Sequence, residues 1–325
     1  MLPMNLPAGM ILLSACLALA STANAELFRA YLASDGNDAN PCTLPQPCRL
    51  LPAALAAIQN DGEVWLLDSA NYSSGPVTIG KAATILAVAG ASASFKDGLE
   101  ISTDEVVTLR NLTFGSGSTA IIVTRATQVN VDDCRFWYRL HGITVAPGNT
   151  YVRVTNSTFE YNFDGAIVAD PGTTVSLSNS HITGGMGIRV FGGGAGAVRT
   201  VLQVTRSTIT KVSAGILLNG NAGTTLAFVH DSEISGTGGL RASNSWPADV
   251  AGPTVITVSG SMLSNNSPAV YAGGFGARVV LNGNTISGNV VGYEIAVAGT
   301  IESAGNNVIR DNGSNTGALS TFGLQ

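Results

Sequence analysis

The sequence predicts an all-β protein, a single-stranded right-handed parallel β-helix of about ten coils with a short N-terminal capping helix. Three observations predict this fold. A short motif recurs at intervals of 22 to 29 residues between Phe114 and Val308. Charged residues form only 11% of the 325 residues and glycine is abundant at 39, a composition that favours strands and turns. Each repeat also alternates apolar and polar residues, as half-buried strands do.

The recurring motif is an Asn or Asp followed, three residues later, by a large apolar residue. Its clearest copies lie at 111–114, 133–136, 156–159 and 179–182, and looser copies continue to 308. An alternating strand precedes the motif, and another strand follows a glycine after it. Asn and Asp suit such a turn because they tolerate left-handed backbone and bond within the turn. We expect stacked coils with a shared core and a ladder of these side-chain amides.

The first 25 residues have the features of a signal peptide. Residues 1–25 carry no charged side chain, contain an apolar run and end in Ala-Asn-Ala, which is typical of a signal-peptidase site. The sequence therefore predicts a secreted or periplasmic protein. The alternative is a lipid anchor at Cys16, because residues 13–16 resemble a lipobox. No apolar segment is long enough for a transmembrane span, so none is predicted.

Residues 26–62 form a predicted entry segment. Cys42 and Cys48 bracket a small loop in an exported chain, which favours a disulfide, with free thiols as the alternative. A helix is expected from Pro52 to Asn60, because proline suits a first helical turn and the apolar residues have helical spacing. This helix would cover the open end of the β-helix.

The β-helix itself is expected over residues 63–312, followed by a C-terminal tail at 313–325. About ten coils, each about 4.8 Å high, would form a rod roughly 50 Å long. Cys134 lies within a copy of the motif and is interpreted as a small buried residue.

The charge of the chain excludes one class of partner. The net charge is −5 and the pI is about 5.1, whereas a nucleic-acid partner would require a basic face. No cofactor is predicted. Four oxygen-bearing side chains near the N-terminus could bind calcium, but their spacing differs from that of an EF-hand and a turn cluster explains them better. These residues are Asp35, Asn37, Asp38 and Asn40. The oligomeric state stays open.

The repeat, together with the segments at 31–38, 40–42 and 47–49, resembles the pectate-lyase-like right-handed β-helix superfamily, including its exported bacterial members. The resemblance covers roughly residues 28 to 312. It implies the architecture and an elongated binding groove along one sheet and its flanking turns. Its members include polysaccharide lyases, hydrolases, epimerases, adhesins and tailspikes. Asp133 stands where pectate lyases would place a histidine, so the motif specifies shape and not chemistry.

The register of two neighbouring repeats predicts a candidate catalytic pair. Phe136 and Phe159 precede turns of equal length, which stacks His141 on Asp164. A histidine oriented by a carboxylate could act as a general acid or base. The neighbouring side chains are predicted to bind sugar: Trp137, Tyr138, Arg139 and Tyr161. The alternative is a surface ion pair beside ordinary exposed aromatic residues.

A second predicted feature is a stripe of outward side chains on the strand that follows the glycine. Its members are Thr144, Ile167, Arg189, Leu217, Arg241, Tyr271 and Glu294. Of these, Arg189, Arg241, Tyr271 and Glu294 are predicted to bind substrate, because arginine pairs well with the carboxylates of an acidic glycan. The alternative is a solvated edge.

These observations predict an exported protein that binds, and if it is an enzyme also modifies, an extracellular or cell-envelope polysaccharide. Whether it is an enzyme stays open. Lyase, epimerase or hydrolase chemistry would then be favoured, since no activated nucleophile stands out. The rival hypothesis is a non-catalytic surface, scaffold or adhesin-like module. The scarcity of clustered carboxylates favours this rival, because glycosidases normally use two placed carboxyl groups.

Overall fold

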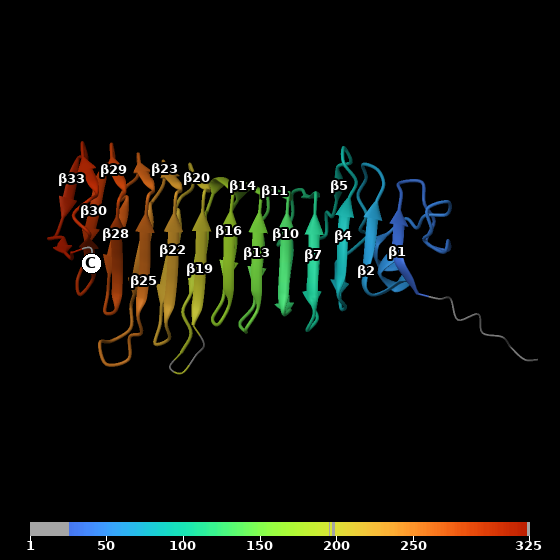
Figure 1. The fold of residues 1–325 in the computed structure, drawn as a ribbon, viewed down its shortest axis with the longest axis horizontal. Coiled ribbons are helices and arrows are strands. Elements are labelled where there is room, and N and C mark those ends of the chain that lie inside the picture. The colour runs from blue at the N-terminus through green and yellow to red at the C-terminus, as the bar shows by residue number, and fades with distance from the viewer. Residues whose placement is uncertain (1–25, 195, 197–198, 324–325) are drawn as a thin grey trace, which may run out of the picture.

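The computed structural model describes residues 26–194, 196 and 199–323, and the chain forms a right-handed parallel β-helix. Parallel strands from successive coils lie side by side along one axis, in chain order from the N-terminal to the C-terminal end (Figure 1). Most coils contribute one strand to each of three sheets, here called sheets I, II and III in the order in which a complete coil visits them. The predicted signal peptide at 1–25, and with it Cys16, lies outside the described residues.

The three sheets contain 13, 10 and 11 strands. Sheet I comprises β1 (Leu27–Leu32), β2 (Ile58–Leu66), β4 (Ala83–Ala87), β7 (Val106–Arg110), β10 (Gln128–Asp132), β13 (Tyr151–Thr155), β16 (Thr174–Ser178), β19 (Thr200–Thr205), β22 (Thr225–His230), β25 (Thr254–Ser259), β28 (Ala277–Asn282), β31 (Thr300–Ser303) and β34 (Ser320–Thr321). Sheet II comprises β5 (Ala93–Ser94), β8 (Leu112–Phe114), β11 (Arg135–Trp137), β14 (Thr158–Asn162), β17 (His181–Gly185), β20 (Thr208–Thr210), β23 (Glu233–Ser235), β26 (Met262–Ser264), β29 (Thr285–Ser287) and β32 (Val308–Arg310). Sheet III comprises β3 (Val77–Ile79), β6 (Leu99–Ser102), β9 (Ile121–Arg125), β12 (His141–Val145), β15 (Gly165–Ala169), β18 (Ile188–Phe191), β21 (Ile216–Gly220), β24 (Leu240–Asn244), β27 (Val270–Gly273), β30 (Val291–Ile295) and β33 (Ser314–Thr316).

One continuous apolar core runs inside the three sheets. In most strands alternate residues point inward and are buried, and they stack on the equivalent residues of the next coil. The motif phenylalanines illustrate this stacking. The rings of Phe114 and Phe136 lie 5.0 Å apart and nearly parallel, and those of Phe136 and Phe159 lie 4.5 Å apart. The sequence therefore repeats because each coil supplies the side chains that stack on the equivalent side chains of the coil before it.

The turn between sheets I and II has the left-handed backbone that the motif predicts. Asn111, Asp133, Asn156, Asn179 and Asp231 all have φ between 49° and 55°. The hydrogen-bonded ladder, however, is formed one residue later and mainly by serine hydroxyls rather than by the expected amides. Each of these side-chain oxygens accepts a hydrogen bond from the backbone N–H of the equivalent residue one coil earlier. The ladder consists of Ser157, Ser180, Ser207, Ser232, Ser261, Asn284 and Asn307.

Cys134 occupies the first place of this ladder and is buried, as predicted. Its N–H donates to the hydroxyl of Ser157, and its Sγ lies 3.4 Å from the carbonyl of Asp132. The Ser157 hydroxyl contacts the carbonyl two residues earlier in the same manner. Burial raises the pKa of the Cys134 thiol to about 12. The odd cysteine is therefore a structural substitute for serine, and its thiol is not activated.

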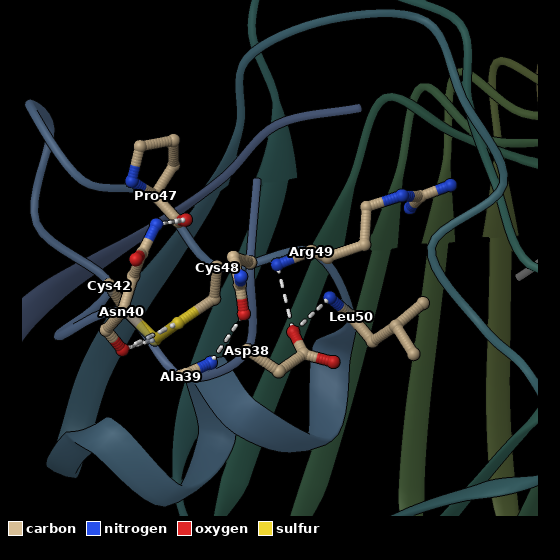
Figure 2. Close-up of a disulfide and its surroundings, with 9 residues drawn as sticks. Asp38, Ala39, Asn40, Cys42, Pro47, Cys48, Arg49 and Leu50 are labelled. Carbon is tan, nitrogen blue, oxygen red and sulfur yellow. Dashed lines mark hydrogen bonds between the residues drawn. A yellow bond between two sulfur atoms is a disulfide. The ribbon is translucent and has the colours of Figure 1, made fainter. Parts of the chain in front are cut away.

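The N-terminal entry segment contains the predicted disulfide between Cys42 and Cys48 (Figure 2). The carboxylate of Asp38 accepts hydrogen bonds from the backbone N–H groups of Arg49 and Leu50, each at 2.8 Å, just before the helix begins (Figure 2). Asn37 accepts a bond from the N–H of Ala39. These side chains therefore serve as turn residues.

The single helix of the described residues, α1 (Leu51–Ala57), lies in this entry segment. It ends earlier than the expected Asn60 because β2 already begins at Ile58. Leu51, Ala54 and Leu55 are buried against the first coils, which agrees with a capping role. Within the described part of the chain, no helix is long and apolar enough to cross a membrane.

Strands also extend beyond the expected limits of the β-helix. β1 pairs in parallel with β2, so sheet I begins within the entry segment. At the other end, the expected tail at 313–325 contains β33 and β34, which add short strands to sheets III and I. The residues of β33 and β34 are all exposed, so no burial alternation marks them, and backbone pairing with the neighbouring coil determines their conformation.

Candidate functional site

Four side chains from successive coils form a hydrogen-bonded line at the start of sheet III. His141 begins β12, and its Nε2 lies 3.2 Å from Oδ2 of Asp164, in the turn before β15. Its Nδ1 lies 3.1 Å from the hydroxyl of Thr119 in the preceding coil. Arg189, on β18, donates to Oδ1 of Asp164 at 2.7 Å. The structure thus brings the predicted pair together and adds two residues that the sequence reasoning had not linked to it.

The register around this line differs from the expected one by a single residue. Trp137 pairs with Glu160 in sheet II, whereas Thr144 pairs with Val168 in sheet III. The chain from Glu160 to Val168 is therefore one residue longer than the chain between their ladder partners Trp137 and Thr144. The extra residue leaves Asp164 outside the strand ladder, from where its carboxylate can contact the imidazole of the previous coil.

The polar side chains of this line are hydrogen-bonded to one another. One ring nitrogen of His141 faces the carboxylate of Asp164 and the other faces the hydroxyl of Thr119, so both nitrogens have a hydrogen-bond partner within the protein. The carboxylate of Asp164 uses one oxygen for His141 and the other for Arg189. A proton transfer to a ligand would require one of these bonds to break. The arrangement is therefore better suited to orienting the guanidinium of Arg189 than to acid–base chemistry.

Exposed aromatic and aliphatic side chains surround the two turns between sheets II and III. Trp137 is 38% exposed and Tyr138, Tyr161 and Phe163 are 45%, 50% and 61% exposed. The rings of Tyr138 and Tyr161 stack at 5.1 Å with an interplanar angle of 11°. Because these two rings cover each other along the helix axis, they present their edges and hydroxyl groups outward. The indole of Trp137 lies over the backbone of Gly115 instead.

Both stacked tyrosines have a left-handed backbone, with φ of 53° at Tyr138 and 54° at Tyr161. In the next coils the equivalent position, directly after or near the end of the sheet II strand, is occupied by Gly184, Lys211 and Gly236. A bulky residue with positive φ costs about 1–3 kcal/mol. The stacked pair returns only about 0.5–1.5 kcal/mol. Stability alone therefore does not account for tyrosine at both positions.

Arg139 was predicted to bind substrate, and the structure contradicts this prediction. Its side chain is fully buried and donates to the carbonyl of Phe95, two coils away. The left-handed residue before it turns the following side chain inward, over Gly117, where a Cβ atom would lie 2.5 Å from the guanidinium. Burial lowers the pKa of Arg139, and the charge of Asp97 opposes this shift. Arg139 thus fills the core and does not reach a ligand.

The outward side chains of sheet III form one continuous stripe, which differs from the predicted stripe at a single position. The ladder pairs Arg189 with Leu217, and then Arg241 and Tyr271 follow in the next coils, up to Glu294. The guanidinium of Arg241 lies 4.2 Å from the centre of the Tyr271 ring.

The stripe contains Val168 and not the predicted Ile167, which is fully buried. The extra residue of the preceding turn shifts the alternation of β15 by one position, and such a shift exchanges the two faces of a strand. Sequence alignment on the glycines could not detect it, since Gly142 and Gly165 are not ladder partners.

Asp170 is a further titratable residue beside this stripe, in the turn from sheet III to sheet I. Burial raises the pKa of its carboxyl group, and the nearby charge of Arg189 opposes that shift. The backbone carbonyl of Asp170 accepts hydrogen bonds from the hydroxyl and the N–H of Thr173, as expected of a turn residue. A carboxyl group with a raised pKa beside an arginine is also a feature of binding and catalytic sites.

Among the described residues, no group of three His, Cys, Asp or Glu side chains is arranged to hold a metal ion. The stripe and the two turns therefore offer arginine, tyrosine and exposed aromatic groups as their means of recognition. Such groups suit a large polar ligand with apolar faces and negative charge.

The left-handed tyrosines yield a first prediction. Tyr161→Asn removes the ring but suits positive φ, so its free energy of unfolding should differ from that of the wild type by no more than about 1 kcal/mol. Tyr161→Ala removes the same ring and keeps the strain, and should be about 1 kcal/mol less stable than the asparagine variant. Thermal unfolding of the three proteins checks this. Equal stability of the two variants would contradict the strain argument.

Asp170 yields a second prediction. Because folding raises its pKa, this group stabilises the folded state most below about pH 3.8 and less as the pH rises through the folded-state pKa. Asp170→Asn should therefore have a higher melting temperature than the wild type at pH 7, and the difference should vanish near about pH 3. Melting curves across this range measure it, with the exposed Asp249→Asn as the control. A lower melting temperature of Asp170→Asn at pH 7 would refute the assignment.

The comparisons with known proteins concern the architecture. Residues 70–201 match the family model described as "Right handed beta helix region". No curated protein matches the chain. Among solved structures, the chain is similar to the pectate lyase Pel9A, with 14% identity, coverage of 89% of this chain and 80% of that chain, and a TM-score of 0.48. For the A-module of the mannuronan C-5 epimerase AlgE6 of Azotobacter vinelandii these values are 14%, 84%, 95% and 0.47.

A third similar structure is the catalytic unit of a GH87 α-1,3-glucanase of Streptomyces thermodiastaticus, with 13% identity, coverage of 84% of this chain and 67% of that chain, and a TM-score of 0.37. These identities are too low to carry over any residue's role. The family model and the strand ladders agree on the architecture. The protein is a right-handed parallel β-helix.

Proposed function

We propose that this protein is exported and binds an acidic extracellular or cell-envelope polysaccharide along the outer face of sheet III. One observation carries the proposal: Arg189 and Arg241 stand two ladder steps apart on the same outward row, followed by Tyr271. A polymer that runs along the helix axis would cross these residues in order. Neighbouring strands lie about 4.8 Å apart, close to the length of one sugar residue in an extended chain.

Arg241 is the better candidate for a ligand carboxylate. It stacks on Tyr271 and makes no ion pair with any acidic residue that the structure describes. Its guanidinium therefore keeps its hydrogen-bond donors for a partner outside the chain. Arginine pairs with a carboxylate through two parallel bonds, which favours uronic acids over neutral sugars.

Arg189 would act with Asp164 and His141 as an oriented unit. Its Nη1 is bound to Asp164, while its buried Nε has no hydrogen-bond partner among the described groups. The bond to Asp164 fixes the guanidinium against the sheet, and the second arginine of the row remains uncompensated. Arg189 is neutralised by Asp164, and Glu294 lies two ladder steps beyond Arg241, so the unpaired positive charge of the row is confined to Arg241.

Binding is favoured over chemistry. Both ring nitrogens of His141 have partners within the protein, and the row offers no pair of free carboxyl groups at the separation that glycoside hydrolysis needs. His141 and Asp164 are thus proposed as positioning residues for Arg189. Catalysis through this pair, as lyase or epimerase chemistry, remains the second candidate function.

The row yields a third prediction. Arg189→Gln and Arg241→Gln should each weaken binding to polygalacturonate or alginate about tenfold, equivalent to about 1.4 kcal/mol, and the effect should shrink at high salt. Arg153→Gln on sheet I, exposed on another face, is the matched control. Pull-down and the release of unsaturated product are scored separately. Product formation would support the catalytic candidate, whereas neither binding nor product would favour the scaffold hypothesis.

Export yields a fourth prediction, based on the signal-peptide features of residues 1–25 and on the disulfide between Cys42 and Cys48. Expressed at full length in a bacterial host, the protein should accumulate outside the cytoplasm with Glu26 as its first residue. Intact-mass measurement of the fractionated cells checks both points. A product lipidated at Cys16 would establish the alternative anchor, and an unprocessed cytoplasmic chain would contradict export.

A further inference from the structure

A pocket of about 410 Å³ opens at the C-terminal end of the outward row, among the turns from sheet III to sheet I. Three aromatic side chains line it: Trp246, which is 44% exposed, Phe275, which is 45% exposed, and the partly buried Tyr271. Pro247 and Val297 add apolar surface. The size falls within the range of small-molecule sites. None of the sequence predictions had assigned a pocket here.

The loop that carries Trp246 is held in place by one buried asparagine. Asn244 accepts a hydrogen bond from the N–H of Trp246 at 3.0 Å. Its amide group donates to the carbonyls of Asn221 and Gly252, both at 3.0 Å, and so ties the start and the end of the loop together. Figure 1 shows this loop, before β25, reaching beyond the neighbouring turns. The exposed indole is therefore presented by a supported loop.

The opposite wall depends on glycines. A Cβ atom on Gly273 would lie 2.3 Å from the hydroxyl oxygen of Tyr271, and one on Gly274 would lie 1.6 Å from the carbonyl oxygen of Asn244. Gly274 also has a φ of 94°. The absence of side chains lets Tyr271 extend along its strand towards the pocket, while Arg241 covers its ring. The guanidinium of Arg241 thus lies against Tyr271, one of the residues that line the pocket, although Arg241 itself is not part of the lining.

We propose that this pocket holds one pyranose ring of the acidic polysaccharide, a uronic acid residue whose apolar ring face packs on Trp246 and whose carboxylate is bound by Arg241. This inference rests on the proposed function and names the place where the bound chain is held most firmly. Sugar rings have apolar C–H faces that pack on aromatic rings, while the carboxylate distinguishes uronic acids from neutral sugars.

The distance along the row predicts how long a ligand must be to contact both Arg189 and the pocket. Arg189 and Tyr271 are separated by three ladder steps, or about 14 Å. An extended chain of three to four sugar residues would therefore reach from the pocket to Arg189. Affinity should rise with chain length up to about four residues and then level off, because longer chains pass beyond both contacts.

The experiment uses isothermal titration calorimetry of the full mature chain with oligogalacturonates and oligomannuronates of one to six residues, and with neutral glucose oligomers of the same lengths. Trp246→Ala and Phe275→Ala should each weaken the binding of acidic tetramers about tenfold and abolish the binding of monomers and dimers. Phe228→Ala, which removes an aromatic ring of similar exposure (43%) on sheet I, is the control and should leave binding unchanged. Circular dichroism and melting curves confirm that each variant is folded.

The outcomes separate this inference from the proposed function. If Arg189→Gln and Arg241→Gln weaken binding while Trp246→Ala and Phe275→Ala do not, the pocket is overturned and the proposed function stands. If the two aromatic variants weaken binding and the arginine variants do not, the polymer path along sheet III and the role of Arg241 are both overturned, and only the aromatic sugar contact in the pocket stands. Equal binding of neutral and acidic oligomers overturns the role of Arg241. No binding to the wild-type chain overturns both proposals.

Discussion

The structure depends on the hydrogen bonding of each coil to its two neighbours. In a parallel ladder the backbone groups of a strand find their partners only in the adjacent strands, so no coil is complete on its own. The same rule applies to the turn after the motif asparagine, where the buried N–H of one coil is satisfied by the serine hydroxyl of the next. Core stacking, such as that of Phe136 on Phe159, follows from this fixed register.

Because register is fixed along the axis, side chains far apart in the sequence fall into straight rows. Thr119, His141, Asp164 and Arg189 come from four successive coils and form one hydrogen-bonded line. Arg241 and Tyr271 continue the neighbouring row towards the C-terminal end. The binding face we propose is thus a consequence of the ladder, and its chemistry depends on which residues occupy a few positions of each row.

The repeat was sufficient to predict the fold, and the left-handed Asn and Asp turns, the disulfide and the buried Cys134 followed from the residue types alone. Counting residues between motifs also brought His141 close to Asp164, although the ladder partner of His141 is Gly165 and the contact depends on the extra residue. Counting failed where a turn gained one residue, which exchanged Ile167 for Val168 on the outer face. It failed again after Tyr138, whose positive φ directs Arg139 inward. Backbone conformation at single residues decides such cases, and composition does not reveal it. The pocket at Trp246 depends on a loop fold that no periodicity describes.

The loop between β24 and β25 has a consequence for how this architecture can change. Thr254 to Ser259 remain in unbroken register with the coils on both sides, although nine residues separate them from the preceding strand. The loop therefore does not disturb the ladder, because the Asn244 amide donates a hydrogen bond to the carbonyl of Gly252 and holds the end of the loop close to its start. Turns on this edge can therefore differ in length while the strand register is kept, so the ligand preference that we propose would be separable from folding. The turns between sheets III and I could thus change in evolution one coil at a time, while the strand ladders stay the same.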